Sequence, residues 1–561
     1  MKKLIVVPVS VLVLVLILTI AACSSTTTTP VQPAATTSST ATSPVVTTPG
    51  NVPGTSTTPA TKPTASVPAA TTPAVGMPRY GGTLRYATPY SPGNPIGTPW
   101  LTIGPTSVSS QIGLEGLTRQ LNNGTDIPTL ATSWDVDLKG PSITFHLRQG
   151  VKFQDGTDFN AQAVKWNLEK GMAPDSMNLS ATNTWKSVDV IDDNTVKVTF
   201  TVWQNTHMEN FANSVGYMIS PTAFQKNGLD YMQYHMIGTG PFTQTGFQRD
   251  VSLTAVKNPN YWDAGKPFLD GVQILYVADD LTRVALLKSG GAEVDDNGRN
   301  VRLARDLANS GYNIVTMAGS GNICLAPDSM NADSPWSNIK VRQAAEYAID
   351  KKAMVDAFGF GYLHVLNQMY LPGSVAYDAA LPDRSYDVAK AKQLMADAGY
   401  PNGFKTGMIV WPSGIDQNMV LAVQSYLSKI GIQTTLQFPT STAIASITIG
   451  GWHNAIVFTP FQLWSNANHT FNYFFNSGYT NYSSVKRPDG WKDMLNASLT
   501  SAAIDPALVK TMEDALYNDS TVIPMTDSVY PWITSDNLQD HGIGSTSTVG
   551  FWTPSKAWLS K

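Results

Sequence analysis

The histidines and other reactive side chains do not fall into a catalytic or metal-binding pattern. No two histidines have the three-residue gap that places both on one helix face, and His-Glu-x-x-His is absent. The nucleophile elbow Gly-x-Ser-x-Gly, the phosphate loop Gly-x-x-x-x-Gly-Lys and the fingerprint Gly-x-Gly-x-x-Gly are also absent. The histidines are His146, His207, His235, His364, His453, His469 and His541. The sequence therefore predicts a binding protein without catalytic residues, metal or cofactor.

The two cysteines, Cys23 and Cys324, are too far apart in the sequence for a disulfide scaffold or a multi-cysteine metal motif. Cys324 lies in the apolar segment Asn322-Ile323-Cys324-Leu325-Ala326, without a neighbouring base or cation. A thiolate needs such a neighbour to form near neutral pH, so a buried, inert thiol is favoured over a nucleophile.

Cys23 ends a segment that is typical of export. Lys2 and Lys3 precede a long apolar run, which closes on Ile20-Ala21-Ala22-Cys23. This ending resembles a bacterial lipobox, so residues 1–23 are predicted to be a lipoprotein signal peptide and Cys23 the lipidation site. The alternative is an uncleaved transmembrane anchor. Either interpretation places the rest of the chain on the extracytoplasmic face of the membrane, in a periplasm or at the cell surface.

Residues 24–78 are mostly Thr, Ser, Pro, Ala and Val, and Lys62 is their only charged residue. Such a segment has almost nothing to bury and is predicted to be a disordered tether; a sticky or O-glycosylated stalk is the alternative. The whole chain carries 37 Lys and Arg against 41 Asp and Glu, a net charge of −4. Nucleic acid is not an expected partner, because its nonspecific binding needs clustered basic residues.

Strand and helix patterns alternate after the tether. Apolar alternation predicts a strand that opens near Arg79, and further strands over residues 142–147 and 195–200. Helical spacing with Asn or Gly at the ends predicts helices. Their ranges are 160–169, 341–358, 387–398 and 418–430. This interleaving predicts an α/β fold.

Several ordered sequence blocks carry a resemblance to one family. They are Ile112 to Leu117 followed by Pro128 to Trp134, Phe145 to Ala161, Gly238 to Phe242, Asn258 to Trp262, Val341 to Asp350, Ala391 to Gly403 and Ile430 to Ile432. Together they resemble the family 5 extracellular solute-binding proteins, the peptide and nickel receptors of ABC importers. The blocks need not form the ligand site. The stretch around Asp155-Gly156 reads as strand, turn and cap, because Asp-Gly favours tight turns.

The resemblance implies a two-lobed, periplasmic-binding-protein-like fold with an accessory subdomain on the first lobe. We expect the first lobe at residues 79–111, 213–302 and 526–561, the accessory subdomain at 112–212 and the second lobe at 303–525. The lobes would close on a peptide or small-molecule ligand. The implied partners are the permease and ATPase subunits of an importer, and the chain is expected to be a monomer.

In the peptide-binding members of that family, a carboxylate late in the second lobe pairs with the ammonium group of the ligand. The corresponding stretch here, Phe458 to Phe475, contains no acidic residue. A buried ammonium without a counter-charge is costly, which weakens the usual peptide mode. Asp416 can substitute, although a helix cap explains it more simply.

The same stretch offers aromatic, amide and imidazole groups for a neutral or weakly charged ligand. The predicted ligand-binding residues of this stretch are Phe461, Gln462, Trp464, Asn466, His469 and Tyr473, and an earlier segment adds Trp411 and Asp416. Trp452 is a further possible wall. Phe471, Phe474 and Phe475 are expected in the core, and for Trp464, Asn466 and His469 a surface loop is the alternative.

Two other classes of function remain open from the residues alone. An exported hydrolase and a surface adhesion protein on its stalk both fit an extracytoplasmic chain. The absence of any catalytic motif favours the solute-binding interpretation over the first.

Overall fold

The computed structural model describes residues 77–91, 95–102, 107–317, 321–476, 478, 481–546 and 552–561. All of them belong to the compact unit Thr72–Lys561. The predicted signal peptide, Cys23 and the predicted tether up to residue 76 lie outside the described residues.

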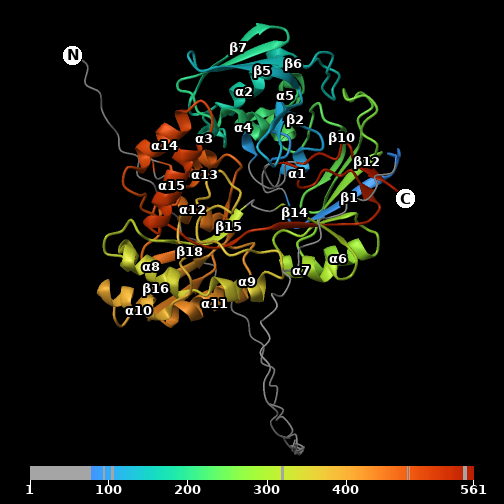
Figure 1. Ribbon diagram of the computed structural model, residues 1–561. Coiled ribbons are helices and arrows are strands. Elements are labelled where there is room, and N and C mark those ends of the chain that lie inside the picture. The colour runs from blue at the N-terminus through green and yellow to red at the C-terminus, as the bar shows by residue number, and fades with distance from the viewer. Residues whose placement is uncertain are drawn as a thin grey trace, which may run out of the picture. The chain divides into compact units, whose positions relative to one another are not determined.

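A seven-stranded sheet forms what we call the first lobe, with the strand order β10-β11-β12-β1-β13-β20-β14 (Figure 1). Strand β1 pairs in parallel with β12 and β13, and the outer pairs are antiparallel. The strands are β1 (Thr83–Thr88), β10 (Phe242–Gln248), β11 (Ser252–Lys257), β12 (Gly271–Tyr276), β13 (Val294–Asp296), β14 (Asn313–Met317) and β20 (Tyr530–Thr534). Leu84 and Trp532 face the main core, whereas Ile533 packs with α6 (Asp280–Lys288) and α7 (Val301–Ala308).

A four-stranded antiparallel sheet, β5-β6-β8-β7, forms the accessory subdomain. Its strands are β5 (Ala131–Asp137), β6 (Ser142–Leu147), β7 (Trp185–Asp192) and β8 (Thr195–Phe200). Alternate residues such as Phe145 and Val198 are buried against α2 (Ala161–Gly171), and Phe211 of α4 (His207–Ala212) joins the same core. One face of the sheet therefore holds the core of this subdomain.

The second lobe is a five-stranded sheet with helices on both faces, in the order β17-β16-β18-β15-β19 (Figure 1). Its strands are β15 (Gly321–Pro327), β16 (Phe404–Val410), β17 (Ile432–Gln437), β18 (Ala455–Gln462) and β19 (Ile523–Asp527). In β15, Leu325 faces one apolar cluster and Cys324 faces the other. The first cluster includes residues of α8 (Ile339–Ala348), α9 (Lys351–Phe358), α10 (Val388–Asp397) and α11 (Gln417–Ser428). The second includes residues of α12 (Ser441–Gly450), α13 (Ala467–Phe475), α14 (Trp491–Thr500) and α15 (Pro506–Asn518).

Short elements complete the three parts. They are η1 (Pro99–Leu101), α1 (Ser107–Ser110), β2 (Glu115–Gly116), β3 (Thr118–Gln120), β4 (Asp126–Pro128), α3 (Leu179–Thr182), η3 (Ser214–Gly216), β9 (Tyr217–Met218), α5 (Pro221–Met232), η4 (Pro335–Ser337), β21 (Leu538–Gln539) and β22 (Trp558–Leu559).

The predicted α/β class is confirmed, and most predicted elements match. The strands over 142–147 and 195–200 have the expected bounds, and the Asn160 side chain caps α2 by accepting from Ala163 N at 3.0 Å. The single helix expected over 341–358 is wrong. Two helices occupy it, because Ile349 leaves the helical conformation and the Asp350 carboxylate caps α9 through Ala353 N at 2.9 Å.

The chain passes between the two large sheets twice, through adjacent antiparallel strands. Strand β14 pairs with β20 in the first lobe, and β15 pairs with β19 in the second. Ser528 N donates to Gly321 O at 2.8 Å where the two passages meet. The boundary expected at 302/303 falls inside α7, and β14 still belongs to the first sheet, so the sheet changes only after residue 317. The expected return near 526 lies at the end of β19.

Candidate ligand-binding cleft

The segment predicted to bind ligand connects β18 to α13 in the second lobe. Phe461 is fully buried in the core, and its ring stacks on Phe474 with centroids 4.3 Å apart. Phe461 lies on the same face of β18 as Val457, which explains why its side chain points into the core. Phe471 and Phe475 are in the same core, as expected, and Gln462 ends the strand opposite Gly321.

Trp464 and His469 stack on each other at the start of α13. Their rings are nearly parallel, with centroids 4.4 Å apart and an interplanar angle of 6°. The Tyr473 ring lies 5.3 Å from the indole and is 47% exposed. The imidazole therefore covers one face of the indole, which leaves less aromatic surface for a ligand than the sequence predicted.

Asn466 and its helix neighbour contact the accessory subdomain. The Asn466 carboxamide oxygen caps α13 by accepting from Asn468 N at 3.0 Å, and its nitrogen donates to Asn205 O at 3.1 Å. Asn468 Nδ2 donates to the Asn205 side-chain oxygen at 3.2 Å. The Asn205 side chain also donates to Ser498 O at 2.8 Å and to Ser501 Oγ at 3.1 Å. We call this set of contacts around Asn205 the latch.

His469 extends the latch by approaching a buried carboxylate of the accessory subdomain. Its Nδ1 lies 3.0 Å from Glu209 Oε2, and only 2% of the Glu209 surface is exposed. Neither Glu209 oxygen has a well-directed hydrogen bond among the described residues. The imidazole and the carboxylate are therefore in contact without a well-directed hydrogen bond. The Glu209 charge also helps burial to raise the pKa of Asp126 to about 6.

Trp411 and Asp416 lie elsewhere in the second lobe. Trp411 is partly buried against the core around α13, and its backbone nitrogen donates to Phe458 O at 2.9 Å. Asp416 caps α11 by accepting from Asn418 N at 2.8 Å, and it lies 3.6 Å from the Arg302 guanidinium. Its carboxylate is thus engaged by a helix end and by a cation of α7. Trp452, the further possible wall, is buried and donates to Ala455 O.

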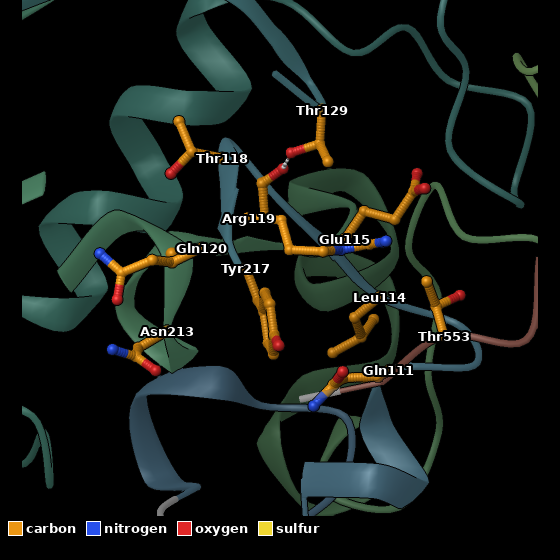
Figure 2. A pocket seen from close by; sticks show the side chains of 12 residues that line it. Gln111, Leu114, Glu115, Thr118, Arg119, Gln120, Thr129, Asn213, Tyr217 and Thr553 are labelled. Atoms are coloured by element: carbon orange, nitrogen blue, oxygen red, sulfur yellow. Dashed lines mark hydrogen bonds between the residues drawn. The ribbon is translucent and has the colours of Figure 1, made fainter. Parts of the chain in front are cut away.

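A small cavity of about 20 Å³, room for about one water molecule and open to solvent, lies where the first lobe meets the accessory subdomain (Figure 2). Its lining is mostly polar, and it consists of Gln111, Leu114, Glu115, Gly116, Thr118, Arg119, Gln120, Thr129, Ala212, Asn213, Tyr217 and Thr553. Gln120 also reaches the second lobe, because its side-chain oxygen accepts from Ser465 Oγ at 3.3 Å. We call this space the junction cavity.

Glu115, in the cavity wall, joins three of the sequence blocks that resemble the family. Its carboxylate accepts from Thr239 Oγ1 at 2.9 Å, Tyr261 Oη at 2.7 Å and Trp262 Nε1 at 2.7 Å. Burial raises its pKa, and these hydrogen bonds oppose the rise. The blocks therefore have a structural role here, as the sequence favoured. Asp155-Gly156 likewise forms a turn, with Gly156 at φ 86°.

Arg119, Asn205 and Glu209 were not identified from the sequence. Each is a single polar residue without a motif, and its partners come from distant segments; Asn205 and Asn466 are 261 positions apart. Arg119 is the only basic residue between Ile112 and Asp137, which is the one sequence signal that it offers.

The remaining predictions about reactive groups concern Cys324, metals and the membrane. Cys324 is fully buried, and burial raises the pKa of its thiol well above the usual value, which fits an inert thiol. Within the described ranges, no group of three or more His, Cys, Asp or Glu side chains is arranged to hold a metal ion. None of the helices in those ranges is long and apolar enough to span a bilayer.

Comparison with known proteins supports the resemblance. The glutathione-binding protein GsiB of Pectobacterium atrosepticum is 34% identical over 314 residues, which are 55% of this chain and 60% of GsiB. GsiB of Escherichia coli O157:H7 is 35% identical over 328 residues, 57% of this chain and 62% of that protein. The alignments therefore span about three fifths of these relatives.

Solved structures share the fold. DppA of Helicobacter pylori in complex with the peptide STSA superposes with a TM-score of 0.73 at 22% identity, over 86% of this chain and 99% of DppA. AppA of Bacillus subtilis with a nonapeptide gives 0.72 at 19% identity, over 86% and 100%. NikZ of Campylobacter jejuni with Ni(L-His) gives 0.70 at 22% identity, over 84% and 97%. The two-lobed binding-protein fold expected from the sequence is confirmed.

The model of "Bacterial extracellular solute-binding proteins, family 5 Middle" matches residues 127–486, more than half of the chain. Members of this family bind solutes outside the cytoplasm and are not enzymes, in agreement with the sequence. The chain belongs to family 5 of the bacterial extracellular solute-binding proteins.

Proposed function

We propose that this protein captures a peptide or another small polar or neutral solute and delivers it to the permease and ATPase subunits of an ABC importer. The family assignment supports the solute-binding role. The relatives and fold neighbours include proteins named for glutathione and structures with a peptide or Ni(L-His), which supports a short peptide or amino-acid derivative as ligand.

Capture works by closure of the second lobe onto the first lobe and its accessory subdomain. The observation that carries this step is the latch, because the Asn205 side chain bonds only to residues of the second lobe among the contacts described: Ser498, Ser501, Ala503 and Asn468. Contacts of this kind form when the lobes approach, so they favour the closed state and add to ligand affinity. The paired strands between the sheets supply the hinge.

The latch also changes the role proposed for the α13 segment. Trp464, Asn466 and His469 act mainly through closure, while Tyr473 and Gln462 remain candidates for direct ligand contact. Because the segment offers no free carboxylate, blocking the amino group of a peptide ligand is expected to have little effect on affinity.

Attachment to the membrane is proposed through an acylated Cys23, with residues 24–78 as a spacer and the folded part acting as a monomer. The support is the sequence alone: a basic start, an apolar run and small residues before the cysteine. Cys23→Ser should release the protein from membranes or leave an unprocessed precursor. Normal processing and retention in the membrane fraction would contradict the anchor.

The solute-binding proposal is tested by melting the purified protein with glutathione, free-acid tri- and tetrapeptides, and nickel with histidine. A ligand present at a hundred times its Kd raises the free energy of unfolding by about 2.7 kcal/mol. The protein should melt at a higher temperature with at least one of these solutes, which mass spectrometry should recover unchanged. Cleavage of the solute would favour an enzyme instead.

The closure step is tested by Asn205→Ala, with calorimetry on the solute that gives the largest shift. Loss of the contacts between the lobes should weaken binding by about 1 to 3 kcal/mol. Asn183→Ala is the matched control, because Asn183 is an exposed asparagine of the same subdomain at the end of α3. Equal affinities in the two variants would contradict a role of the latch in capture.

A further inference from the structure

The junction cavity contains a cation that no carboxylate neutralises directly. In the part of the chain that the structure describes, the Arg119 side chain has no hydrogen bond or ion pair, although it is partly buried in the cavity lining. Its positive charge acts on its surroundings, since it opposes the rise in the pKa of Tyr217 and of Glu115. A guanidinium has five N–H donors, and here all of them remain available.

Two hydroxyl groups of the same cavity are also unbonded. Thr118 is 2% exposed, and its Oγ1 finds no hydrogen-bond partner; the buried Oγ1 of Thr553 also has none. A buried hydroxyl without a partner is unfavourable, and most such groups in folded proteins are bonded. Figure 2 shows the Arg119 side chain extending toward Thr553, whereas Thr118, the preceding residue of the same strand, points to the other side.

Glu115, which lines the same cavity, does not form an ion pair with the Arg119 guanidinium. Both of its oxygens already accept hydrogen bonds, one from Tyr261 and the other from Thr239 and Trp262. The carboxylate makes no ion pair within 4.0 Å of the guanidinium, although the two charges interact at longer range. The other polar lining groups, Gln111, Gln120, Thr129 and Asn213, carry no charge.

We propose that the junction cavity is the subsite that receives a carboxylate of the ligand, with Arg119 as its anchor and the Thr553 hydroxyl as an additional donor. A guanidinium binds a carboxylate through two parallel N–H···O bonds, which matches the one unsatisfied cation of this lining. The inference rests on the proposed function and narrows its substrate class to solutes with an acidic end group. Gln120 lies in the same lining and touches Ser465, so occupation of the subsite is coupled to the second lobe.

The experiment compares two matched libraries of tri- and tetrapeptides, one with free carboxyl ends and one with amidated ends, by calorimetry and native mass spectrometry. The wild-type protein should retain the free-acid library at least about 30-fold more tightly than the amides, as expected for loss of one partner of a buried charge pair. A third arm of non-peptide mono- and dicarboxylic acids separates a terminal carboxylate from other sources of the same group.

Arg119→Met should abolish the preference for free acids, and Arg119→Lys should restore part of it. Arg249→Met is the control for the change in net charge, because Arg249 lies 62% exposed in the β10–β11 turn. Thr553→Val keeps the side-chain shape but removes the hydroxyl. It should weaken binding of free acids about 2- to 12-fold, without lowering the melting temperature of the ligand-free protein.

The outcomes separate the two proposals. Equal binding of both libraries, or a preference that survives Arg119→Met, would overturn the subsite and leave the solute-binding function intact. If neither library binds, a peptide ligand is excluded, and the third arm decides: binding that depends on Arg119 supports the subsite, and binding that does not, or none at all, overturns it.

Discussion

The junction cavity and the α13 segment are both polar, but they differ in how fully their polar groups are bonded. At α13, the Asn466 side chain bonds to the helix end and to Asn205, and the His469 ring stacks on Trp464 with its Nδ1 3.0 Å from Glu209. In the junction cavity, Arg119 and Thr553 have no described partner. Residue type alone therefore identifies groups that can bind, and only the contacts distinguish those that are still available to a ligand.

The largest expected effect is the change in the free energy of unfolding when Glu115, in the wall of the junction cavity, is replaced. Glu115→Ala leaves the buried donors Thr239, Tyr261 and Trp262 without an acceptor, which should lower the free energy of unfolding by about 3 to 6 kcal/mol. Arg119→Met, four positions away, should change it by less than about 1 kcal/mol. Urea denaturation of the ligand-free protein measures both. Similar losses in the two variants would mean that Arg119 supports the fold rather than a ligand.

A substitution at α13 should change the ligand affinity more than the free energy of unfolding. His469→Ala removes the partner of the buried Glu209 carboxylate and should weaken ligand binding by about 1.5 to 3 kcal/mol. His453→Ala is the matched control, since His453 pairs with Asp333 at 3.0 Å on an exposed surface and should leave affinity unchanged. Calorimetry with the solute found by melting gives both values. Identical affinities would assign His469 to packing alone.

A smaller, pH-dependent effect is expected at Asp126, which lies between the two regions. Burial raises the pKa of this carboxyl from 3.8 to about 6 in the folded protein, and a hydrogen bond from Gln120 partly opposes the rise. The folded state then holds the proton more tightly, so stability falls as the pH rises from about 4 through about 6.

Asp126→Asn removes this loss and should stabilise the protein near neutral pH by about 1 to 2 kcal/mol. The gain should vanish at about pH 3, below the ordinary aspartate pKa, where both folded and unfolded wild-type chains carry the proton. Urea titrations of both proteins across this range measure the difference. A gain that does not change with pH would exclude the carboxyl as its source.

Local features of the fold could be predicted from the sequence, because their causes lie within a few residues. The strand at 142–147 shows strict alternation, and the Asn160 cap uses a backbone nitrogen three positions away. The sequence predicts one continuous helix over 341–358, because its apolar spacing continues across Asp350. The helix is interrupted at Ile349, which the spacing does not reveal, and Asp350 then caps the second helix.

The candidate site was less predictable, because it depends on pairs of distant residues. The stretch at α13 was predicted to bind ligand, and in the structure Asn466 bonds to Asn205 and His469 lies 3.0 Å from Glu209. The core position of Phe461 follows from counting alternate residues along β18, a signal that was present in the sequence. Arg119 becomes a candidate binding residue only because, among the described residues, the fold places no hydrogen-bond or ion-pair partner beside its guanidinium.

The position of β20 has a consequence for the order in which this exported chain can fold. β20 lies between β13 and β14 in the first sheet, yet residues 530–534 follow every other strand of the two large sheets in the chain. Until they arrive, β13 and β14 lack the neighbour that they share, whereas every strand of the second sheet precedes them in the chain. The second sheet lacks only its edge strand β19 until residues 523–527 have been made, whereas the first sheet lacks an interior strand until β20 follows, so the first lobe is the later of the two to complete its sheet.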